Sequence, residues 1–476
     1  MSQNEVKYQI ERGLRHHLSF APTSNQEEAI QNFAKFLCSG GSALTFLLKG
    51  YAGTGKTSLI AAIVKTLKSF EVKTILMAPT GRAAKVASTY SGEPASTIHK
   101  RIYFRKRLPT GSFVLTKQPN LFKNTLFIVD EASMISDAGG DWSMGNSLLQ
   151  DIFDYVFTGE NCRLMLVGDD AQLPPVGCEE SPALDPEYLN SAFHLNLHRA
   201  LLKEVVRQQG DSGILYNATL LRIALLNEAC EVYPKFDVKG FEDVKRISSA
   251  EMSDSINASY SKYGIDGTII ICRSNKRAYQ FNQEVRNRIL YLDSEIQTGD
   301  YVMIVKNNYF WTKDIVELDF LANGDRAQLL KIHSFKEIYG FHFATAVLEL
   351  LDVPNQPHVE VIVILDALAS EAPSLSTQQQ EQLYNAVMED YAEIGNKQER
   401  IKLVKENPYY NAVQLKFAYA VTCHKSQGGQ WNHVYIDQGY FLDEMLNTEF
   451  YRWIYTAITR ATDTVFWINF KDEFFE

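Results

Sequence analysis

The sequence has few cysteines, and they are not grouped. Six cysteines are scattered through 476 residues, and none belongs to a C-x-x-C pair. Disulfide frameworks and structural zinc sites both need cysteines at characteristic short spacings. We therefore expect neither feature, and the composition fits a reducing compartment such as the cytoplasm. The fold must then be stabilised by buried apolar side chains, which the hydrophobic content of 45% can supply.

Long hydrophobic runs are also absent from the sequence. No apolar stretch approaches the roughly 18–20 residues that a membrane-spanning helix needs. The N-terminal segment mixes charged and apolar residues throughout, so it lacks the apolar core of a signal peptide. We expect no membrane partner, and a length of 476 residues predicts about three domains.

Basic residues are fewer than acidic ones, with 47 Lys and Arg against 57 Asp and Glu. The formal net charge of −10 argues against a protein that coats nucleic acid through its overall charge. The stretch from His99 to Phe113 departs from this balance, because it carries five basic residues and no acid, with Tyr103 and Phe104 among them. A local basic patch of this kind can still bind nucleic acid.

Short apolar runs recur along the chain and end in polar or small residues. Such runs are typical of strands buried on both faces of a parallel sheet. Between them, segments such as 448–461 place apolar residues at i, i+3, i+4 and i+7, which predicts helices. The runs form two groups, so we predict an α/β fold with two domains, at 1–210 and at 211–309 joined to 415–476. The runs are 73–80, 124–133, 162–170, 267–275, 432–439 and 463–469.

The interval 310–414 has a different pattern. Its first part contains runs that are typical of a small antiparallel β unit, and its second part is polar and favours helix. We interpret the interval as a subdomain inserted into the second α/β domain.

A glycine-rich stretch indicates a phosphate-binding loop. The segment from Gly50 to Thr57 reads G-x-x-x-x-G-K-T and lies between a strand pattern and a helix pattern, as this motif requires. Its backbone N–H groups and the following helix N-terminus favour phosphate oxygens. Lys56 is predicted to reach the β- and γ-phosphates, and the Thr57 hydroxyl to bind Mg²⁺. The predicted nucleotide-binding residues of the loop are Gly50, Ala52, Gly53, Thr54, Gly55, Lys56, Thr57 and Ser58.

Two adjacent acids follow a later apolar run. Asp130 ends a predicted strand, where an acid typically helps to hold Mg²⁺, and Glu131 is suited to orient and deprotonate a water molecule. Gln172 follows another run and could contact both the γ-phosphate and that water. The alternative for the two acids is the capping of a helix. Together they favour hydrolysis of ATP over nucleotide binding alone.

The ordered set of motifs resembles helicases of superfamily 1, B type, the group of RecD, Dda and Pif-like DNA helicases. The resemblance extends from about residue 20 to the C-terminus, with weak guidance in 310–414. It implies two RecA-like domains, with ATP between them and single-stranded nucleic acid across their tops, and an SH3-like inserted β unit. The motifs are GYAGTGKT (50–57), APTGRAAKVAS (78–88), STIHK (96–100), DEAS (130–133), GDDAQLPPVG (168–177), EVVRQ (204–208), VTCHKSQGGQ (421–430) and YTAITRA (455–461).

The resemblance also implies roles around the nucleotide. Gln26 is similar to a glutamine that reads adenine, and Ser24 with Glu27 predicts a capping box that places Gln26 in the first turn of a helix. Arg207 and Arg460 are similar to two arginines that the second side of the cleft offers to the γ-phosphate. A salt bridge for Arg207 and compensation of a helix dipole by Arg460 are the alternatives.

The path of the nucleic acid is implied in the same way. Hydroxyls, imidazoles and backbone N–H groups can bind phosphates without reading sequence. Gly428 would link this path to the ATP, and purely structural roles are the alternative for the two histidines. The candidate residues are Pro79, Thr80, Lys85, Thr97, His99, Thr422 and His424.

The basic stretch lies where the family inserts a β-hairpin that acts as a wedge at the duplex junction. We therefore predict a hairpin insertion within 99–123, with a turn at Pro109 and Gly111. Pro109 and Phe113 are our candidates to meet the separating bases, because aromatic rings can stack on them. The alternative is a solvated basic hairpin whose aromatic residues pack on the first domain.

The sequence thus predicts an ATP-dependent DNA helicase that uses Mg²⁺, acts on single-stranded DNA and duplex junctions, and belongs to the cytoplasm. The resemblance implies 5′→3′ travel. We expect a monomer, and protein partners in repair, recombination or replication would fit. The alternatives are a translocase that acts on RNA or remodels protein–DNA complexes, and a P-loop switch or loader ATPase within a larger complex.

Overall fold

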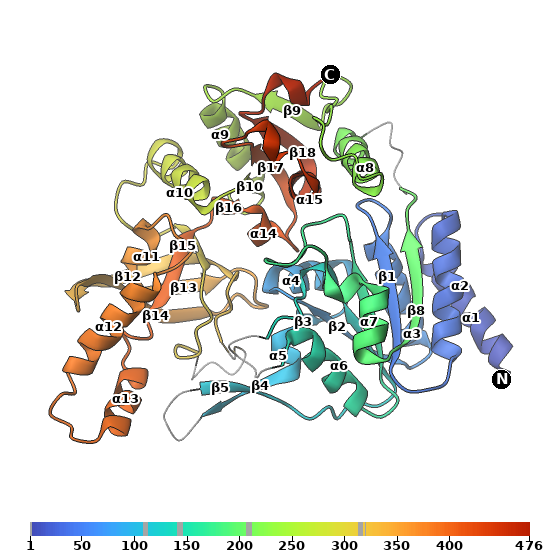
Figure 1. The fold of residues 1–476 in the computed structure, drawn as a ribbon, viewed down its shortest axis with the longest axis horizontal. Coiled ribbons are helices and arrows are strands. Elements are labelled where there is room, and N and C mark those ends of the chain that lie inside the picture. Colours follow the sequence, from blue (N-terminus) through green and yellow to red (C-terminus); the bar gives the residue numbers. More distant parts are fainter. Residues whose placement is uncertain (1, 108–112, 140–145, 206–211, 313–317, 319) are drawn as a thin grey trace.

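The computed structural model describes residues 2–107, 113–139, 146–205, 212–312, 318 and 320–476. These residues form two α/β domains and a β-barrel, which lies at the left of Figure 1. The barrel is inserted into the second domain, and a small hairpin is inserted into the first. The fold class predicted from the sequence is confirmed.

The first domain is built on a six-stranded sheet of order β3-β2-β6-β7-β1-β8. All of its neighbouring strands are parallel. In β6, Leu126 and Ile128 belong to one core cluster, while Phe127 and Val129 belong to another. This alternation shows that both faces of the sheet are covered. The strands are β1 (Leu44–Gly50), β2 (Lys73–Ala78), β3 (Ala95–Thr97), β6 (Thr125–Val129), β7 (Arg163–Gly168) and β8 (Asn196–Leu202).

Helices cover the two faces of this sheet. Helices α1, α2 and α3 pack on one face, around Phe33, Phe46 and Ile63. On the other face α5 and α6 contribute Ile102 and Ile152. The helices are α1 (Gln3–His17), α2 (Ser24–Cys38), α3 (Lys56–Ser69), α4 (Gly81–Ser91), α5 (Ile98–Ile102), α6 (Leu148–Thr158) and α7 (Pro186–Phe193).

The inserted hairpin follows α5 directly. Its strands β4 (Tyr103–Arg107) and β5 (Phe113–Lys117) pair antiparallel and lie at the lower edge of Figure 1. The base of the hairpin is anchored on α6, because the Tyr103 hydroxyl donates a hydrogen bond to Asp151 at 2.7 Å. The predicted tip residue Pro109 and the side chain of Phe113 lie outside the described residues.

The second domain has a five-stranded parallel sheet of order β16-β10-β17-β18-β9. The helix predicted at 448–461 is α15, which ends at Ile458, so that Arg460 lies in the turn beyond it. The strands are β9 (Val244–Ile247), β10 (Thr268–Cys272), β16 (Ala420–Thr422), β17 (Trp431–Asp437) and β18 (Ala461–Ile468). The helices are α8 (Gly213–Leu226), α9 (Met252–Tyr263), α10 (Asn275–Glu284), α14 (Cys423–Ser426) and α15 (Thr448–Ile458).

The insertion is a closed barrel of order β11-β12-β13-β14-β15. Its first strand lies before the predicted interval 310–414, and its last strand ends after that interval. The final pair, β14 and β15, is parallel instead of antiparallel, because three helices carry the chain back between these strands. The strands are β11 (Tyr301–Ile304), β12 (Arg326–Ile338), β13 (Phe341–Leu350), β14 (His358–Ile364) and β15 (Val413–Phe417). The helices are α11 (Leu365–Ala369), α12 (Thr377–Glu389) and α13 (Lys397–Glu406).

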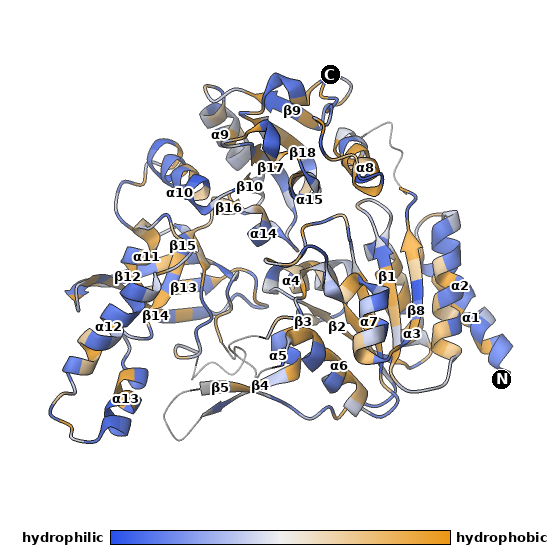
Figure 2. Ribbon diagram, in the orientation of Figure 1, coloured by the Kyte–Doolittle hydropathy of each residue, from blue (hydrophilic) through white to orange (hydrophobic). Residues whose placement is uncertain are grey.

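Apolar residues are concentrated in the strands, while the outer helices carry many polar residues (Figure 2). In the described parts of the chain, every helix is too short or too polar to cross a lipid bilayer. The short helical turns are the 3₁₀ segments Ala132–Met134, Pro182–Leu184, Asp443–Met445 and Asp472–Phe474 and the π-helical segment Val285–Ile289.

A buried carboxylate joins the barrel to the second sheet. Asp300 precedes β11 and accepts hydrogen bonds from Arg286 Nε at 2.9 Å and Nη2 at 3.0 Å. The Tyr419 hydroxyl, between β15 and β16, donates to the same carboxylate at 2.9 Å. Asp300 therefore connects both chain crossings between the barrel and the parallel sheet.

We expect Asp300→Ala to reduce the free energy of unfolding by about 3–5 kcal/mol, because it leaves the buried Arg286 guanidinium without its partner. Urea unfolding followed by circular dichroism measures this loss. Asp293→Ala, at an exposed position of the same loop, is the matched control. Equal stability of the two variants would contradict the role given to the ion pair.

Candidate functional site

A cavity of about 770 Å³ lies between the two α/β domains. The first domain contributes the loop after β1, helix α4 and the acids that follow β6. The second domain contributes the segment 459–462, which follows α15. The carboxyl ends of parallel strands are the usual location of ligand sites in α/β proteins.

The glycine-rich loop has the geometry of a phosphate cradle. It begins where β1 ends at Gly50, and α3 begins at Lys56. Gly53 and Gly55 have φ angles of 74° and 82°, which glycine adopts without strain. Gly55 occupies the N-cap of α3, and no side chain caps that helix. The first N–H groups of α3 therefore suit an anionic ligand.

The lysine of the loop is held by the loop itself. Lys56 Nζ donates to the carbonyl oxygens of Gly50 at 2.6 Å and Tyr51 at 2.9 Å. It also lies 3.6 Å from the carboxylate of Asp169. A phosphate entering the loop would therefore compete with these oxygens for the ammonium group.

The two acids predicted from the sequence both line the cavity. The Asp130 carboxylate accepts hydrogen bonds from the Tyr90 hydroxyl at 2.7 Å and from the Glu131 N–H at 2.9 Å. Glu131 has a φ of 54°, in the left-handed region, and caps no helix with its side chain. Burial raises the pKa of both carboxyl groups.

The donor set beside the loop fits Mg²⁺. Thr57 and Asp130 line the same cavity, and a hydroxyl with a carboxylate offers the hard oxygen ligands that Mg²⁺ prefers. Within the described residues, no cluster of three or more His, Cys, Asp or Glu side chains could hold a metal by itself. Phosphate oxygens and water would have to supply the remaining ligands.

Gln172 also lines the cavity and is almost fully buried. Its Oε1 atom is buried and accepts no hydrogen bond from any residue that the structure describes. A buried polar atom of this kind is costly unless a ligand or water completes it. The position agrees with a glutamine that faces a bound phosphate.

Asp169 is a site residue that the sequence reasoning missed. It follows β7 and is 1% exposed. Its carboxylate faces Lys56 and accepts a hydrogen bond from the Tyr455 hydroxyl at 2.8 Å. Burial raises the pKa of Asp169, and the Lys56 ammonium opposes that shift. The only local signal was the pair of adjacent acids in GDDAQ (168–172). The prediction selected the glutamine of this motif and neither of the acids.

Four hydrogen bonds cross the cleft next to the cavity. The Tyr455 hydroxyl, which donates to Asp169, also accepts the N–H of Ala52 at 2.8 Å. The backbone of Leu173 makes the other two bonds. Its N–H donates to Thr456 Oγ1 at 2.8 Å, and its carbonyl accepts a hydrogen bond from Gln427 Nε2 at 2.7 Å. The loop after β7 and helix α15 are therefore joined directly.

The second domain places one of the two predicted arginines in the cavity. Arg460 is 4% exposed, donates to the Thr456 carbonyl at 3.0 Å, and lies 3.9 Å from Glu131. Arg207 lies outside the described residues. Gly428 does not line the cavity; a Cβ atom there would lie 2.7 Å from that of Ala83, so this glycine permits close contact between the domains.

The prediction for the start of α2 was wrong in register. Thr23 is the N-cap, and Gln26 completes the capping box by accepting the Thr23 N–H at 3.1 Å. Glu27 instead binds Arg15, with Nε at 3.0 Å. Gln26 is fully buried and donates to the Thr54 carbonyl at 2.9 Å. Its side chain supports the glycine-rich loop from behind and does not line the cavity.

A charge cluster joins all three parts of the protein at the edge of the cavity. Arg82, in α4, donates to the Gln430 carbonyl at 2.6 Å and stacks on the Trp431 ring at 4.1 Å. Its guanidinium lies 3.7 Å from Asp266 in the second domain and 3.9 Å from Asp352 in the barrel. Burial lowers the pKa of Arg82 to about 10, so it remains charged at neutral pH.

The residues predicted to contact nucleic acid lie at strand ends in both domains. Thr80 follows β2, and Thr97 ends the neighbouring strand β3. Their hydroxyls cap α4 and α5, each accepting an N–H group at 3.2 Å. Pro79 precedes Thr80. Thr422 begins α14 in the second domain, where no side chain caps the helix. Lys85 is turned toward the barrel and donates to the Leu351 carbonyl at 2.9 Å.

The two candidate histidines are half-buried. Burial lowers the pKa of His99 to about 4 and also lowers that of His424. The His99 ring lies 5.6 Å from that of Tyr103 and 6.2 Å from that of Phe320. At neutral pH these side chains offer hydrogen bonds or packing to a ligand, and they offer no positive charge.

Comparison with known proteins gives matches for both α/β domains. Residues 38–178 match the family model described as an AAA domain, and residues 417–468 match the UvrD-like helicase C-terminal domain. An uncharacterized protein of Acanthamoeba polyphaga mimivirus, R530, is 24% identical over 88% of this chain and 94% of its own length. The ATP-dependent DNA helicase dda of Enterobacteria phage T4 is 27% identical, and the match covers 54% of this chain and 55% of dda.

Among solved structures, the chain is similar to a Pif1 helicase from Bacteroides in complex with ADP-AlF3 and single-stranded DNA. The sequences are 15% identical, the match covers 96% of this chain and 95% of that one, and the TM-score is 0.47.

We expect Tyr455→Phe to loosen the cleft, because Ala52 and Asp169 both lose a buried hydrogen-bond partner, at a typical cost of about 1–3 kcal/mol. Hydrogen–deuterium exchange of the 50–56 loop should accelerate by roughly tenfold. Tyr440→Phe, at an exposed position of the same domain, should leave that exchange unchanged. Identical exchange in the two variants would contradict the role of the hydroxyl.

Proposed function

We propose that this chain, a helicase of superfamily 1B, hydrolyses ATP to travel 5′→3′ along single-stranded DNA and to separate duplex strands. The observation that carries the proposal is the meeting of Lys56, Glu131 and Arg460 in one cavity between two parallel-sheet domains. Both α/β domains therefore supply groups that act on the same phosphate. The state of the nucleotide thus affects the position of one domain relative to the other.

ATP binds in this proposal with its phosphates in the loop that begins at Gly50. The ammonium of Lys56 leaves the carbonyl oxygens of Gly50 and Tyr51 and moves to the phosphates, because charged oxygens are stronger acceptors. Thr57 and Asp130 would hold Mg²⁺, which neutralises charge on the phosphates. The Tyr90 hydroxyl orients the Asp130 carboxylate for this purpose.

Hydrolysis depends on groups from both domains. Glu131 takes the proton of the attacking water, and its raised pKa makes it a stronger base than an exposed glutamate. Arg460 stabilises the charge that develops on the transferred phosphoryl group, and Gln172 orients the water. The 3.9 Å separation of Arg460 and Glu131 supports a role for both groups at the same phosphate.

Movement along DNA follows from the contacts across the cleft. The bonds from Tyr455, Thr456 and Gln427 join the loop after β7 to the second domain. Loss of the γ-phosphate weakens the bridge between Lys56 and Arg460, and the domains separate. Thr80 and Thr97 hold the strand on one domain and Thr422 on the other, so that alternating grip converts this opening and closing into travel.

We expect Lys56→Ala to abolish ATP hydrolysis stimulated by single-stranded DNA, with kcat falling by at least about a hundredfold, since the phosphates lose their principal cation. A coupled assay with purified protein measures the rate. Lys65→Ala, at an exposed position of α3, controls for the loss of one charge from the same helix. Persisting DNA-stimulated hydrolysis in Lys56→Ala would refute the assignment of the site.

The direction of travel is tested with duplexes that carry either a 5′ or a 3′ single-stranded tail. We expect strand separation from 5′ tails only. Activity confined to 3′ tails would refute the polarity. RNA tails of the same sequence serve as a matched control for the nature of the strand, and stimulation by RNA alone would contradict the DNA assignment.

A further inference from the structure

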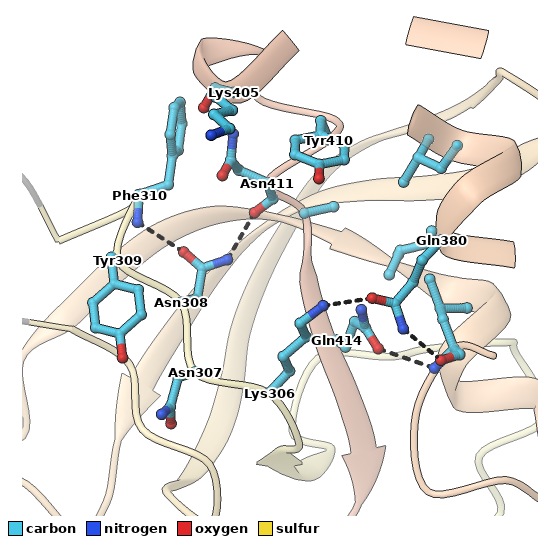
Figure 3. A pocket seen from close by; sticks show the side chains of 14 residues that line it. Lys306, Asn307, Asn308, Tyr309, Phe310, Gln380, Lys405, Tyr410, Asn411 and Gln414 are labelled. Atoms are coloured by element: carbon cyan, nitrogen blue, oxygen red, sulfur yellow. Dashed lines mark hydrogen bonds between the residues drawn. The ribbon is translucent and has the colours of Figure 1, made fainter. Parts of the chain in front are cut away.

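A second cavity, of about 270 Å³, lies within the insertion (Figure 3). Its walls are the segment after β11 (306–310), the end of β14, the start of β15, and helices α12 and α13. It is separate from the cavity between the two α/β domains, and the two sites share no lining residue.

The cavity is electropositive in an acidic protein. Two lysines, Lys306 and Lys405, line it, and no Asp or Glu among the residues that the structure describes does, although the whole chain has a net charge of −10. Lys306 Nζ donates to Gln380 Oε1 at 2.6 Å (Figure 3). The Lys405 ammonium makes no hydrogen bond or ion pair with any side chain that the structure describes. This balance favours an anionic ligand.

The polar walls of the cavity are fixed in position. Asn308 donates to the Asn411 carbonyl at 2.8 Å and accepts the Phe310 N–H at 3.0 Å (Figure 3). The Gln414 side chain accepts the Leu375 N–H at 3.0 Å. A preformed wall of this kind lowers the entropy cost of ligand binding.

Three aromatic residues, Tyr309, Phe310 and Tyr410, line the cavity beside these amides. The Tyr410 ring is supported by an edge contact with Tyr384, at a centroid distance of 5.8 Å. Aromatic side chains next to amides and cations are the usual surroundings of a nucleobase that has left its stack.

The cavity lies one aromatic layer from the predicted DNA path. Tyr309 packs on the first domain, in the cluster that contains Tyr103 and Leu115 at the base of the hairpin. The Tyr309 ring lies 5.1 Å from that of Phe320, which lies 6.2 Å from that of His99. The wall of the cavity is therefore continuous with the surface on which α5 and the hairpin meet the barrel.

We propose that this cavity binds one nucleotide unit, with the planar base against Tyr410 and the phosphate next to Lys306 and Lys405. The proposal rests on the proposed function, because a single strand passing α5 supplies such a unit next to the cavity. A free nucleoside monophosphate has the same chemistry. A site here would hold an unstacked base away from the hairpin and slow its return to the duplex.

The phosphate contact is tested with Lys405→Gln in the full chain. We measure the affinity for a fluorescein-labelled oligothymidylate by anisotropy over a range of salt concentrations. Affinity at low salt should fall by roughly three- to tenfold, and the slope of log K against log salt should fall by about 0.7, the value for one phosphate of a single strand. Lys402→Gln, which lies one turn earlier at an exposed position of α13, is the control and should bind like the unchanged protein.

The base contact is tested with Tyr410→Ala and Tyr410→Phe. Loss of one stacked base should weaken binding by fivefold or more in Tyr410→Ala, whereas Tyr410→Phe keeps the ring and should bind normally. Thermal unfolding verifies that Tyr410→Ala is folded. Normal binding by Tyr410→Ala, or equal effects of Lys405→Gln and Lys402→Gln, would overturn the proposal.

The source of the nucleotide is distinguished with thymidine 5′-monophosphate as a competitor. Displacement of the labelled strand that disappears in Lys405→Gln assigns the cavity to free nucleotides, and a Lys405-dependent effect on the strand alone assigns it to DNA. ATP hydrolysis at saturating DNA should be unchanged in Lys405→Gln. Absence of DNA-stimulated hydrolysis in the unchanged protein would refute the proposed function. That outcome is independent of the binding comparison between Lys405→Gln and Lys402→Gln, which tests the cavity.

Discussion

One buried hydroxyl group links the two α/β domains beside the cavity. Tyr455 lies on α15 and donates to Asp169, while it accepts the N–H of Ala52 in the glycine-rich loop. Burial and the adjacent carboxylate raise the pKa of Tyr455 well above its usual value, so the hydroxyl keeps the proton that it donates. Because Arg460 follows the same helix, this contact also sets the distance between the arginine and the acids of the first domain. The shape of the cavity therefore depends in part on this contact.

The parts of the structure that could be predicted from the sequence are those encoded locally. Buried parallel strands read as apolar runs, because both of their faces are covered, and β6 illustrates this with two core clusters on alternate residues. The glycine-rich loop was recognisable because its glycines, Lys56 and Thr57 all lie within the short segment from Gly50 to Thr57. Asp130 and Glu131 were recognisable for the same reason, as a carboxylate pair at the end of a strand.

The remaining features depend on contacts between distant segments. Asp169 and Tyr455 are 286 residues apart, and no local pattern indicates that one will bind the other. Gln26 also donates to the Thr54 carbonyl, a contact that the packing of α2 behind the loop determines. The parallel pair of the barrel was equally hidden, because α11, α12 and α13 separate β14 from β15 in the sequence. Contacts between residues that are far apart in the sequence are the feature that a single sequence indicates most weakly.

The order of strands in the second sheet has a consequence for synthesis on the ribosome. Strand β10 pairs with β16 across the whole insertion, and β9 lies at the far edge with β18 as its neighbour. The first domain has all of its strands once β8 has been translated, whereas β9 must wait for Val465 to Ile468 before it can pair. Throughout this interval the nascent chain exposes apolar strands that have no partner, and such species are prone to aggregate. We therefore expect the yield of folded protein to depend more on chaperones and elongation rate than the stability of the finished fold would indicate.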